Sequence, residues 1–276
     1  MRRRHLSDKP MGSVTCSTYE EMEALFAAFH KGKIGLLIII GNPGIQKSNL
    51  ASEGSADSQT VVITGRNSAL GIYRSVYMAN GKNVVLDDVD GLVDTPVGRC
   101  LLRELCSTTP VKIVNWNTAS HVLAAEGIPR QFSTRSKVAI VTNRFTNLDS
   151  LEPIIDRGHL VFFEPDAREI HLRVAQFFWD QEVYDFIGER LNLFERLRLS
   201  MRLYVKSAEL KAAQLDWRRL VLASCLTGNA LEVARLKADG SFVTEEERAA
   251  AFIKRTGASR ATYFNQARKL PAPIAM

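Results

Sequence analysis

Short apolar runs alternate with amphipathic stretches over the first 165 residues. The clearest run, 36–40, is continuous and lies between two glycines, which is typical of a strand buried on both faces of a parallel sheet. Apolar positions at helical spacing predict helices over 20–30, 69–78 and 97–105. Strands that alternate with helices indicate an α/β domain. The other strand-like runs are 61–63, 84–86, 111–114, 138–141 and 160–163.

The pattern changes near Pro165. From there to about residue 236 nearly every stretch has helical spacing, which predicts a second, all-helical domain. The expected fold is an α/β three-layer sandwich with a parallel central sheet, followed by a small all-α domain and a short C-terminal helical segment. We expect a loose N-terminal arm over 1–19, the α/β domain over 20–165, the helical domain over 166–240 and the C-terminal segment over 241–276.

Composition is that of a globular protein. The chain has 276 residues, of which 46% are hydrophobic and 24% charged, and this length fits one large domain and a smaller one. The net charge of +6 permits an acidic partner such as nucleic acid. Four cysteines without a CxxC pair argue against structural zinc, and reduced thiols in the cytoplasm are the expectation. The longest apolar run is too short to span a bilayer, so we expect no membrane segment.

A candidate phosphate-binding loop follows the run 36–40. The residues from Gly41 read GNPGIQKS and precede a predicted helix, which is the context of a P-loop. Backbone N–H groups and the helix N-terminus would hold the phosphates, Lys47 would reach the β- and γ-phosphates, and Ser48 would bind Mg²⁺. Gln46 stands where the pattern has its second glycine, so hydrolytic competence stays open, as does a loop without any ligand. The expected nucleotide contacts are Gly41, Asn42, Pro43, Gly44, Ile45, Gln46, Lys47, Ser48 and Asn49.

Two carboxylates end the run 84–86. Ligands in open α/β sheets bind outside the carboxyl ends of the strands, so Asp87 is expected to face the loop and hold Mg²⁺. Asp88 could orient or deprotonate an attacking water. The alternative is that both residues only form a polar turn. The predicted cofactors are therefore ATP and Mg²⁺.

This order of elements resembles the AAA+ family of P-loop ATPases over about residues 20–226. The resemblance implies a polar sensor after the next strand, for which Asn143 is the match. It also implies an arginine finger before the last strand, Arg157, which would reach the nucleotide of a neighbouring subunit. A homo-oligomer is therefore expected. The helical domain corresponds to the family's lid, whose second sensor would be Arg202.

Some features of the resemblance leave alternatives open. Arg218 and Arg219 compete with Arg202 for the sensor role. Asp88 stands where the family usually has glutamate, whose longer arm brings the carboxylate nearer to the water. Extra residues, about 111–132, lie between the acidic strand 84–86 and the sensor strand 138–141. They predict either an added strand or a hairpin. This insertion could touch the substrate or could be a passive edge strand.

The C-terminal segment carries a second functional signal. Thr244 and Glu247 form a capping-box pattern, and Gly257 and Ser259 fit the end of one helix and the start of another. Residues 256–264 resemble the turn and recognition helix of helix-turn-helix proteins. The alternative is a hairpin that packs on the lid, with Phe252, Ile253 and Phe264 as its core. The candidate DNA contacts are Arg260, Thr262, Tyr263, Asn265 and Arg268.

Three functions are compatible with these patterns. The first is an oligomeric AAA+ ATPase that couples ATP binding and hydrolysis to work on DNA or on a DNA-bound protein complex. The second, suggested by Gln46, is a nucleotide-responsive DNA-binding switch with little or no hydrolysis. The third is a P-loop phosphotransferase, against which the separate helical domain and the missing acceptor motif argue.

Overall fold

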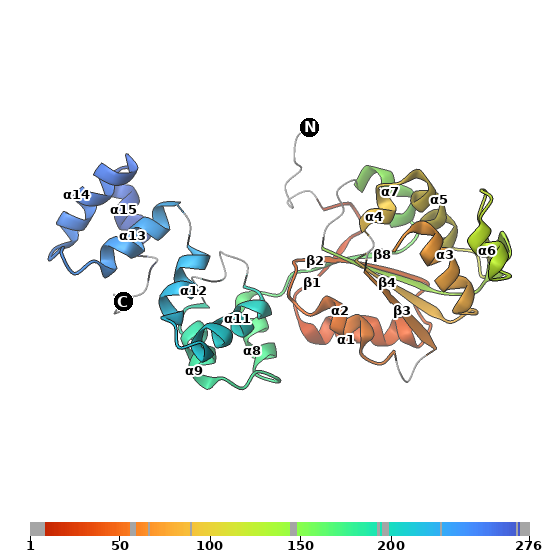
Figure 1. Ribbon diagram of the computed structural model, residues 1–276, viewed down its shortest axis with the longest axis horizontal. Coiled ribbons are helices and arrows are strands. Elements are labelled where there is room, and N and C mark those ends of the chain that lie inside the picture. Colours follow the sequence, from red (N-terminus) through yellow and green to blue (C-terminus); the bar gives the residue numbers. More distant parts are fainter. Residues whose placement is uncertain are drawn as a thin grey trace. The chain divides into compact units, whose positions relative to one another are not determined.

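The computed structural model describes residues 9–55, 59–65, 67–88, 90–143, 148–191, 194, 199–226, 228–268 and 270. The chain divides into two compact units, Met1–Pro165 and Asp166–Met276. The first is a sheet between layers of helices, and the second is helical (Figure 1). Within the described ranges, no helix has the length and apolar character needed to cross a membrane.

The first unit is built on a six-stranded sheet in which every pair of neighbouring strands is parallel. The strand order is β1-β8-β2-β7-β4-β3. The inner strands are buried on both faces, which explains their continuous apolar runs. The prediction of an α/β domain with a parallel sheet is confirmed. The strands are β1 (Val14–Cys16), β2 (Leu36–Gly41), β3 (Thr60–Thr64), β4 (Asn83–Asp87), β7 (Val138–Thr142) and β8 (His159–Phe163).

Helices cover both faces of this sheet (Figure 1). Alternate residues of β2 point to opposite faces, so Ile38 packs in the cluster that includes Ile72 and Leu101, while Ile39 is buried on the other side. One face carries α1 (Tyr19–His30) and α2 (Lys47–Ser52). The other carries α3 (Ala69–Met78), α4 (Asp90–Val93), α5 (Pro96–Leu105) and α7 (Leu148–Ile155).

The expected N-terminal arm is wrong in part, because Val14–Cys16 form strand β1 at the edge of the sheet. β1 pairs with β8 in parallel register, and Lys9 donates hydrogen bonds to Thr15 Oγ1 and Glu164 Oε2, both at 2.8 Å. Cys16 is buried there. Three residues are too few to show an alternating pattern, so periodicity alone does not detect this strand.

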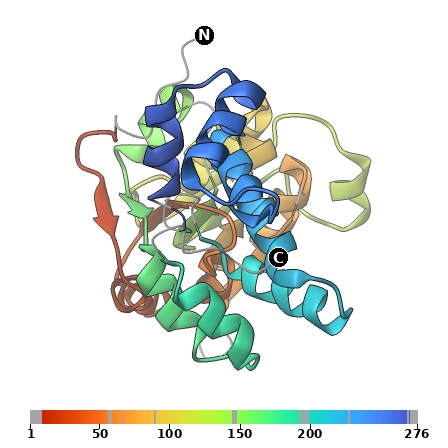
Figure 2. The same ribbon diagram turned by 90° about the vertical axis from the view of Figure 1, so that its left-hand side faces the viewer.

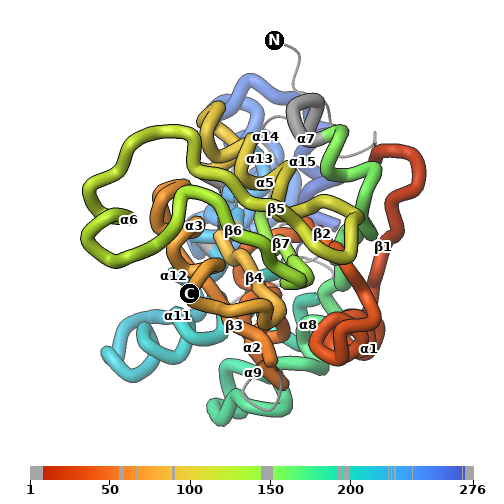
Figure 3. Tube along the Cα trace, turned by 90° about the vertical axis from the view of Figure 1, so that its right-hand side faces the viewer, coloured from red at the N-terminus to blue at the C-terminus, as the bar shows by residue number. Residues whose placement is uncertain are grey.

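The extra residues, about 111–132, form a hairpin, which was one of the two predicted alternatives. Strand β5 (Lys112–Asn115) pairs antiparallel with β6 (Gln131–Thr134), and α6 (His121–Ala125) lies in the connection (Figure 3). Counting 111–114 among the strands of the parallel sheet was therefore wrong. Val114 joins the core next to α5, and the Tyr73 hydroxyl donates to Pro129 O at 2.8 Å, which fixes the hairpin to α3.

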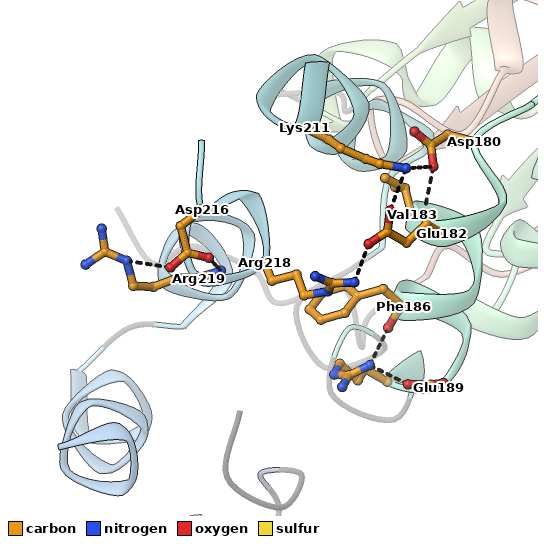
Figure 4. Close-up of polar contacts among 10 residues, drawn as sticks. Asp180, Glu182, Val183, Phe186, Glu189, Lys211, Asp216, Arg218 and Arg219 are labelled. Carbon is orange, nitrogen blue, oxygen red and sulfur yellow. Dashed lines mark hydrogen bonds and ion pairs between the residues drawn. The ribbon is translucent and has the colours of Figure 1, made fainter. Parts of the chain in front are cut away.

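In the described residues, the first part of the second unit comprises four helices. Helix α11 contacts the other three, and a polar network joins α9, α11 and α12 (Figure 4). Lys211 lies 2.7 Å from both Asp180 and Glu182, and Arg218 pairs with Glu182. These pairs are partly exposed, so each contributes little stability. The helices are α8 (Ala167–Val174), α9 (Gln181–Gly188), α11 (Met201–Ala212) and α12 (Trp217–Cys225).

The last three helices share a separate core (Figure 2, blue). They are α13 (Gly228–Ala238), α14 (Glu245–Thr256) and α15 (Arg260–Ala267). Val233 of α13 packs with Phe252 and Tyr263, so this group begins at Gly228 rather than at residue 241. Ile253 is exposed, so its assignment to the core of the alternative hairpin was wrong. Within this group, α13 supplies the apolar surface that a two-helix hairpin lacks.

Candidate active site

The loop after β2 is held tightly against the sheet. A Cβ atom at Gly41 would lie 2.7 Å from Phe163 O, so only glycine fits there. Gly44 has φ of 77°, a left-handed conformation that glycine adopts at no steric cost. The buried Tyr19 donates a hydrogen bond from its hydroxyl to Ile45 O at 3.3 Å. The loop therefore has a defined backbone course before α2 begins at Lys47.

Lys47 is a buried cation, and the residue is only 5% exposed. Its Nζ donates to Asn42 O at 2.6 Å and to Asn143 Oδ1 at 3.1 Å. Asn143 directly follows β7, which is the neighbour of β2 in the sheet. The loop lysine and the predicted sensor residue are thus in contact at the carboxyl ends of adjacent strands.

Asp87, the last residue of β4, completes this edge. β4 lies on the other side of β7, and Asp87 is 9% exposed. Burial raises the pKa of the Asp87 carboxyl, and a hydrogen bond with Ser48 and the Lys47 charge only partly oppose this rise. A carboxylate beside a hydroxyl and a buried ammonium fits a magnesium–triphosphate pair. In the described residues no group of three or more His, Cys, Asp or Glu side chains could hold a metal.

Backbone strain is concentrated at the same place. Four non-glycine residues in the described ranges have positive φ: Asn80 and Gln214 follow helix ends, where this conformation is common, but Gln46 and Asp88 do not. Gln46 has φ 63° and ψ 17°, and Asp88 has φ 58°. Such conformations persist only where the surroundings enforce them, and they concentrate at functional sites. Gln46 thus has a left-handed backbone conformation, which glycine adopts without steric cost.

We expect the change Gln46→Gly to increase both stability and nucleotide affinity. The left-handed conformation costs a residue with a side chain about 1–2 kcal/mol. Glycine avoids this cost but loses more backbone entropy on folding, so the net gain in the free energy of unfolding is roughly 0.5–1 kcal/mol. Chemical denaturation measures it. Gln214→Gly, with φ 57° at a helix end, is the matched control and should stabilise without changing MgATP binding. An unchanged or lower free energy of unfolding in the Gln46 variant would contradict the assigned strain, and weaker MgATP binding would contradict the expected gain in affinity.

We expect Asp87→Asn to stabilise the protein in the absence of nucleotide. The pKa of Asp87 is higher in the folded than in the unfolded chain, so the folded state binds more protons. Stability therefore falls as pH rises from the unfolded value through the folded pKa, and the charged form is disfavoured at neutral pH. An amide removes this penalty, which should increase the free energy of unfolding by about 1 kcal/mol at pH 7. The exposed Asp94→Asn is the control; a destabilised Asp87 variant would disprove this account.

Of the other catalytic candidates, Asp88 follows Asp87 at this edge, whereas Arg157 and Arg202 lie elsewhere. Asp88 is exposed, and its N–H donates to Val141 O at 3.1 Å. Arg157 is exposed in the turn before β8, and its Nη1 donates to Arg103 O at 3.1 Å. That turn is at the amino ends of the strands, whereas the loop follows the carboxyl end of β2, so Arg157 does not join the site of its own chain. Arg202 is exposed on α11 in the second unit, and its sensor role stays a prediction.

The competing arginines Arg218 and Arg219 have partners inside the second unit. Arg218 pairs with Glu182, and Arg219 with Asp216 at 3.4 Å (Figure 4). Arg218 also lies over the Trp217 ring, 4.8 Å from its centroid. Both arginines therefore have a local structural role.

One DNA-contact candidate is wrong. Tyr263 is fully buried, and its hydroxyl donates to Glu245 Oε2 at 2.8 Å, because its ring fills the core between α14 and α15. Asn265 and Arg268 are exposed on α15, and Arg260 is exposed but paired with Glu246. Thr262 is half-buried, with its hydroxyl 2.9 Å from that of Ser259.

Tyr19 is a site residue that sequence reasoning missed. A signal for its position did exist, since Thr18 and Glu21 form a capping box that starts α1 at Tyr19. Its contact with the loop joins segments 26 residues apart, and no local pattern reveals such a contact. The site thus rests on strands β2, β7 and β4 and on the start of α1. Comparison with known proteins finds no family model that matches this chain and no curated protein with significant similarity to it.

Proposed function

We propose that this chain is an AAA+-type P-loop ATPase that binds MgATP at the edge formed by β2, β7 and β4. The observation that carries this proposal is the buried Lys47 ammonium, which contacts Asn143 and lies beside the Asp87–Ser48 pair. Burying an ammonium is costly, and a triphosphate compensates for that cost. The strain at Gln46 and Asp88 supports the same location.

Each residue then has a defined role. Lys47 binds the β- and γ-phosphates, while Ser48 and Asp87 hold Mg²⁺. Asn143 and Asp88 orient the attacking water. Arg157 acts on the nucleotide of a neighbouring subunit, and Arg202 senses it from the helical lid, so the working form is a homo-oligomer. Hydrolysis proceeds by positioning and electrostatic stabilisation without a covalent intermediate on the protein.

The ATPase would act on DNA or on a DNA-bound protein complex. Helices α13–α15 form a compact group in which Phe252 and Tyr263 face the core, while Asn265 and Arg268 are exposed. Exposed polar and basic side chains on a second helix after a tight turn are what a recognition helix needs. A cytoplasmic location, where Cys16 and Cys106 stay reduced, fits this role.

The second candidate function is a nucleotide-responsive DNA-binding switch with little hydrolysis. It is favoured by Gln46, which brings a side chain into the loop. It is also favoured by the exposed Asp88, whose side chain is shorter than that of glutamate and places the carboxylate farther from the attacking water. Phosphate release measured with and without duplex DNA separates the two. Turnover well above that of Lys47→Ala supports the ATPase, MgATP binding without turnover supports the switch, and absence of MgATP binding contradicts both.

A further inference from the structure

The edge of the sheet opposite the candidate site carries a row of positive charges. In a parallel sheet all amino ends lie at one edge, so the turns that precede β8, β2, β7 and β4 are neighbours. These four turns cover 156–158, 31–35, 135–137 and 79–82. Their basic residues, called here the basic edge, are Lys31, Lys33, Lys82, Arg135, Lys137 and Arg157.

Contacts between the turns bring these residues together. Lys137 donates from Nζ to Gly32 O, and Val138 N donates to Gly35 O at 3.1 Å, which joins the turns before β7 and β2. Val84 N donates to Lys137 O at 2.8 Å, which brings the start of β4 alongside. Gly158 packs against Leu36, since a Cβ there would lie 2.5 Å from Leu36 Cγ. The row therefore runs across four adjacent strands.

These charges lack local compensation. Five of the six residues are exposed and Lys137 is half-buried, and none of them forms an ion pair with a residue in the described ranges. Within the four turns Asp156 is the only carboxylate; the turn before β3 is described only in part. Residues at the opposite edge include Asp87, Asp88 and Glu164. These carboxylates lie at the other ends of the strands and do not compensate the basic edge.

We propose that the basic edge without Arg157, which the proposed function gives to a neighbouring subunit, binds the phosphate backbone of duplex DNA. The turns that carry these residues precede three adjacent strands, β2, β7 and β4, and at about 4.8 Å spacing they give a row roughly 10 Å long, which is the scale of neighbouring phosphates along one strand of a duplex. Among the described residues of the four turns there is no tryptophan, tyrosine or phenylalanine on which unpaired bases could stack, which favours the duplex over single strands. This goes beyond the proposed function, which assigns DNA contacts to α15 alone.

The test compares two double variants of the full chain. Lys33→Gln with Arg135→Gln removes two charges from the basic edge, and Arg168→Gln with Lys206→Gln removes two exposed charges from the second unit. Binding to a labelled 20-base-pair duplex is followed by fluorescence anisotropy over a range of salt concentrations. The edge variant should bind more weakly, and its slope of log Kd against log salt should fall by about two. The control should match wild type.

Several outcomes would overturn the inference: an unchanged slope in the edge variant, an equal loss in the control, or abolition of all DNA binding by Arg260→Gln with Arg268→Gln alone. If polyglutamate competes as strongly as DNA of equal charge, the partner is an acidic polypeptide, and this outcome also overturns the inference. MgATP binding is measured on the same samples. A wild type that binds DNA through the edge but fails to bind MgATP would remove the proposed function and leave the basic edge standing.

Discussion

Lys47→Ala is expected to reduce the affinity for MgATP at least a hundredfold. The buried ammonium now donates to Asn42 O and Asn143 Oδ1. Charge-assisted hydrogen bonds to phosphate contribute about 1.5–3 kcal/mol each, so losing two of them removes roughly 3 kcal/mol or more. Isothermal titration of the variant with MgATP measures the loss.

The control for Lys47→Ala is a lysine of the second unit. Lys206 is exposed on α11, and Lys206→Ala should bind MgATP like wild type. The Lys47 variant should keep its fold, because burying an ammonium opposes folding and its removal relieves that cost. A folded Lys47 variant with wild-type affinity would show that the loop is no phosphate site.

Arg157→Ala should lower turnover at least a thousandfold and leave MgATP affinity within about twofold. An arginine that acts on the transferring phosphoryl group stabilises charge in the transition state, an effect of 10³–10⁵ in kcat. Binding is spared because Arg157 lies at the amino ends of the strands, away from the loop of its own chain. Arg103→Ala is the control, since only its backbone carbonyl contacts Arg157.

Mixing variants tests whether Arg157 acts between subunits. A Lys47→Ala subunit keeps its arginine, and an Arg157→Ala subunit keeps its nucleotide site. Mixed under conditions that favour assembly, the two should recover a measurable fraction of wild-type turnover, assayed by phosphate release in the absence of DNA. Failure of the mixture to recover activity, or normal turnover by Arg157→Ala alone, would remove the trans-acting role.

The central sheet could be predicted because its strands are buried on both faces. Burial makes 36–40 and 138–141 continuous apolar runs, and these became β2 and β7. Strand direction then brings whatever follows these runs to one edge, which is why Lys47 and Asn143 could be expected close together. Neither inference needs long-range information beyond the order of elements.

Features that depend on distant partners could not be predicted. Strand β1 has three residues and exists because β8 supplies its hydrogen bonds. Helix α13 was assigned to the preceding domain because its sequence does not reveal that Val233 packs against Tyr263. For the short α15, helical spacing alone left open which side faces the core, so Tyr263 was taken for a surface residue. The positive φ of Gln46 follows from the loop geometry, against the local preference of glutamine.

The central claim is that Lys47 and Asp87 act on one triphosphate–metal pair. ATP binding by wild type, Lys47→Ala and Asp87→Asn, each titrated with and without Mg²⁺, tests it most directly. The account predicts that Mg²⁺ strengthens ATP binding to wild type, that this strengthening is lost in Asp87→Asn, and that Lys47→Ala binds poorly in both conditions. An equal effect of Mg²⁺ on wild type and Asp87→Asn would contradict the claim.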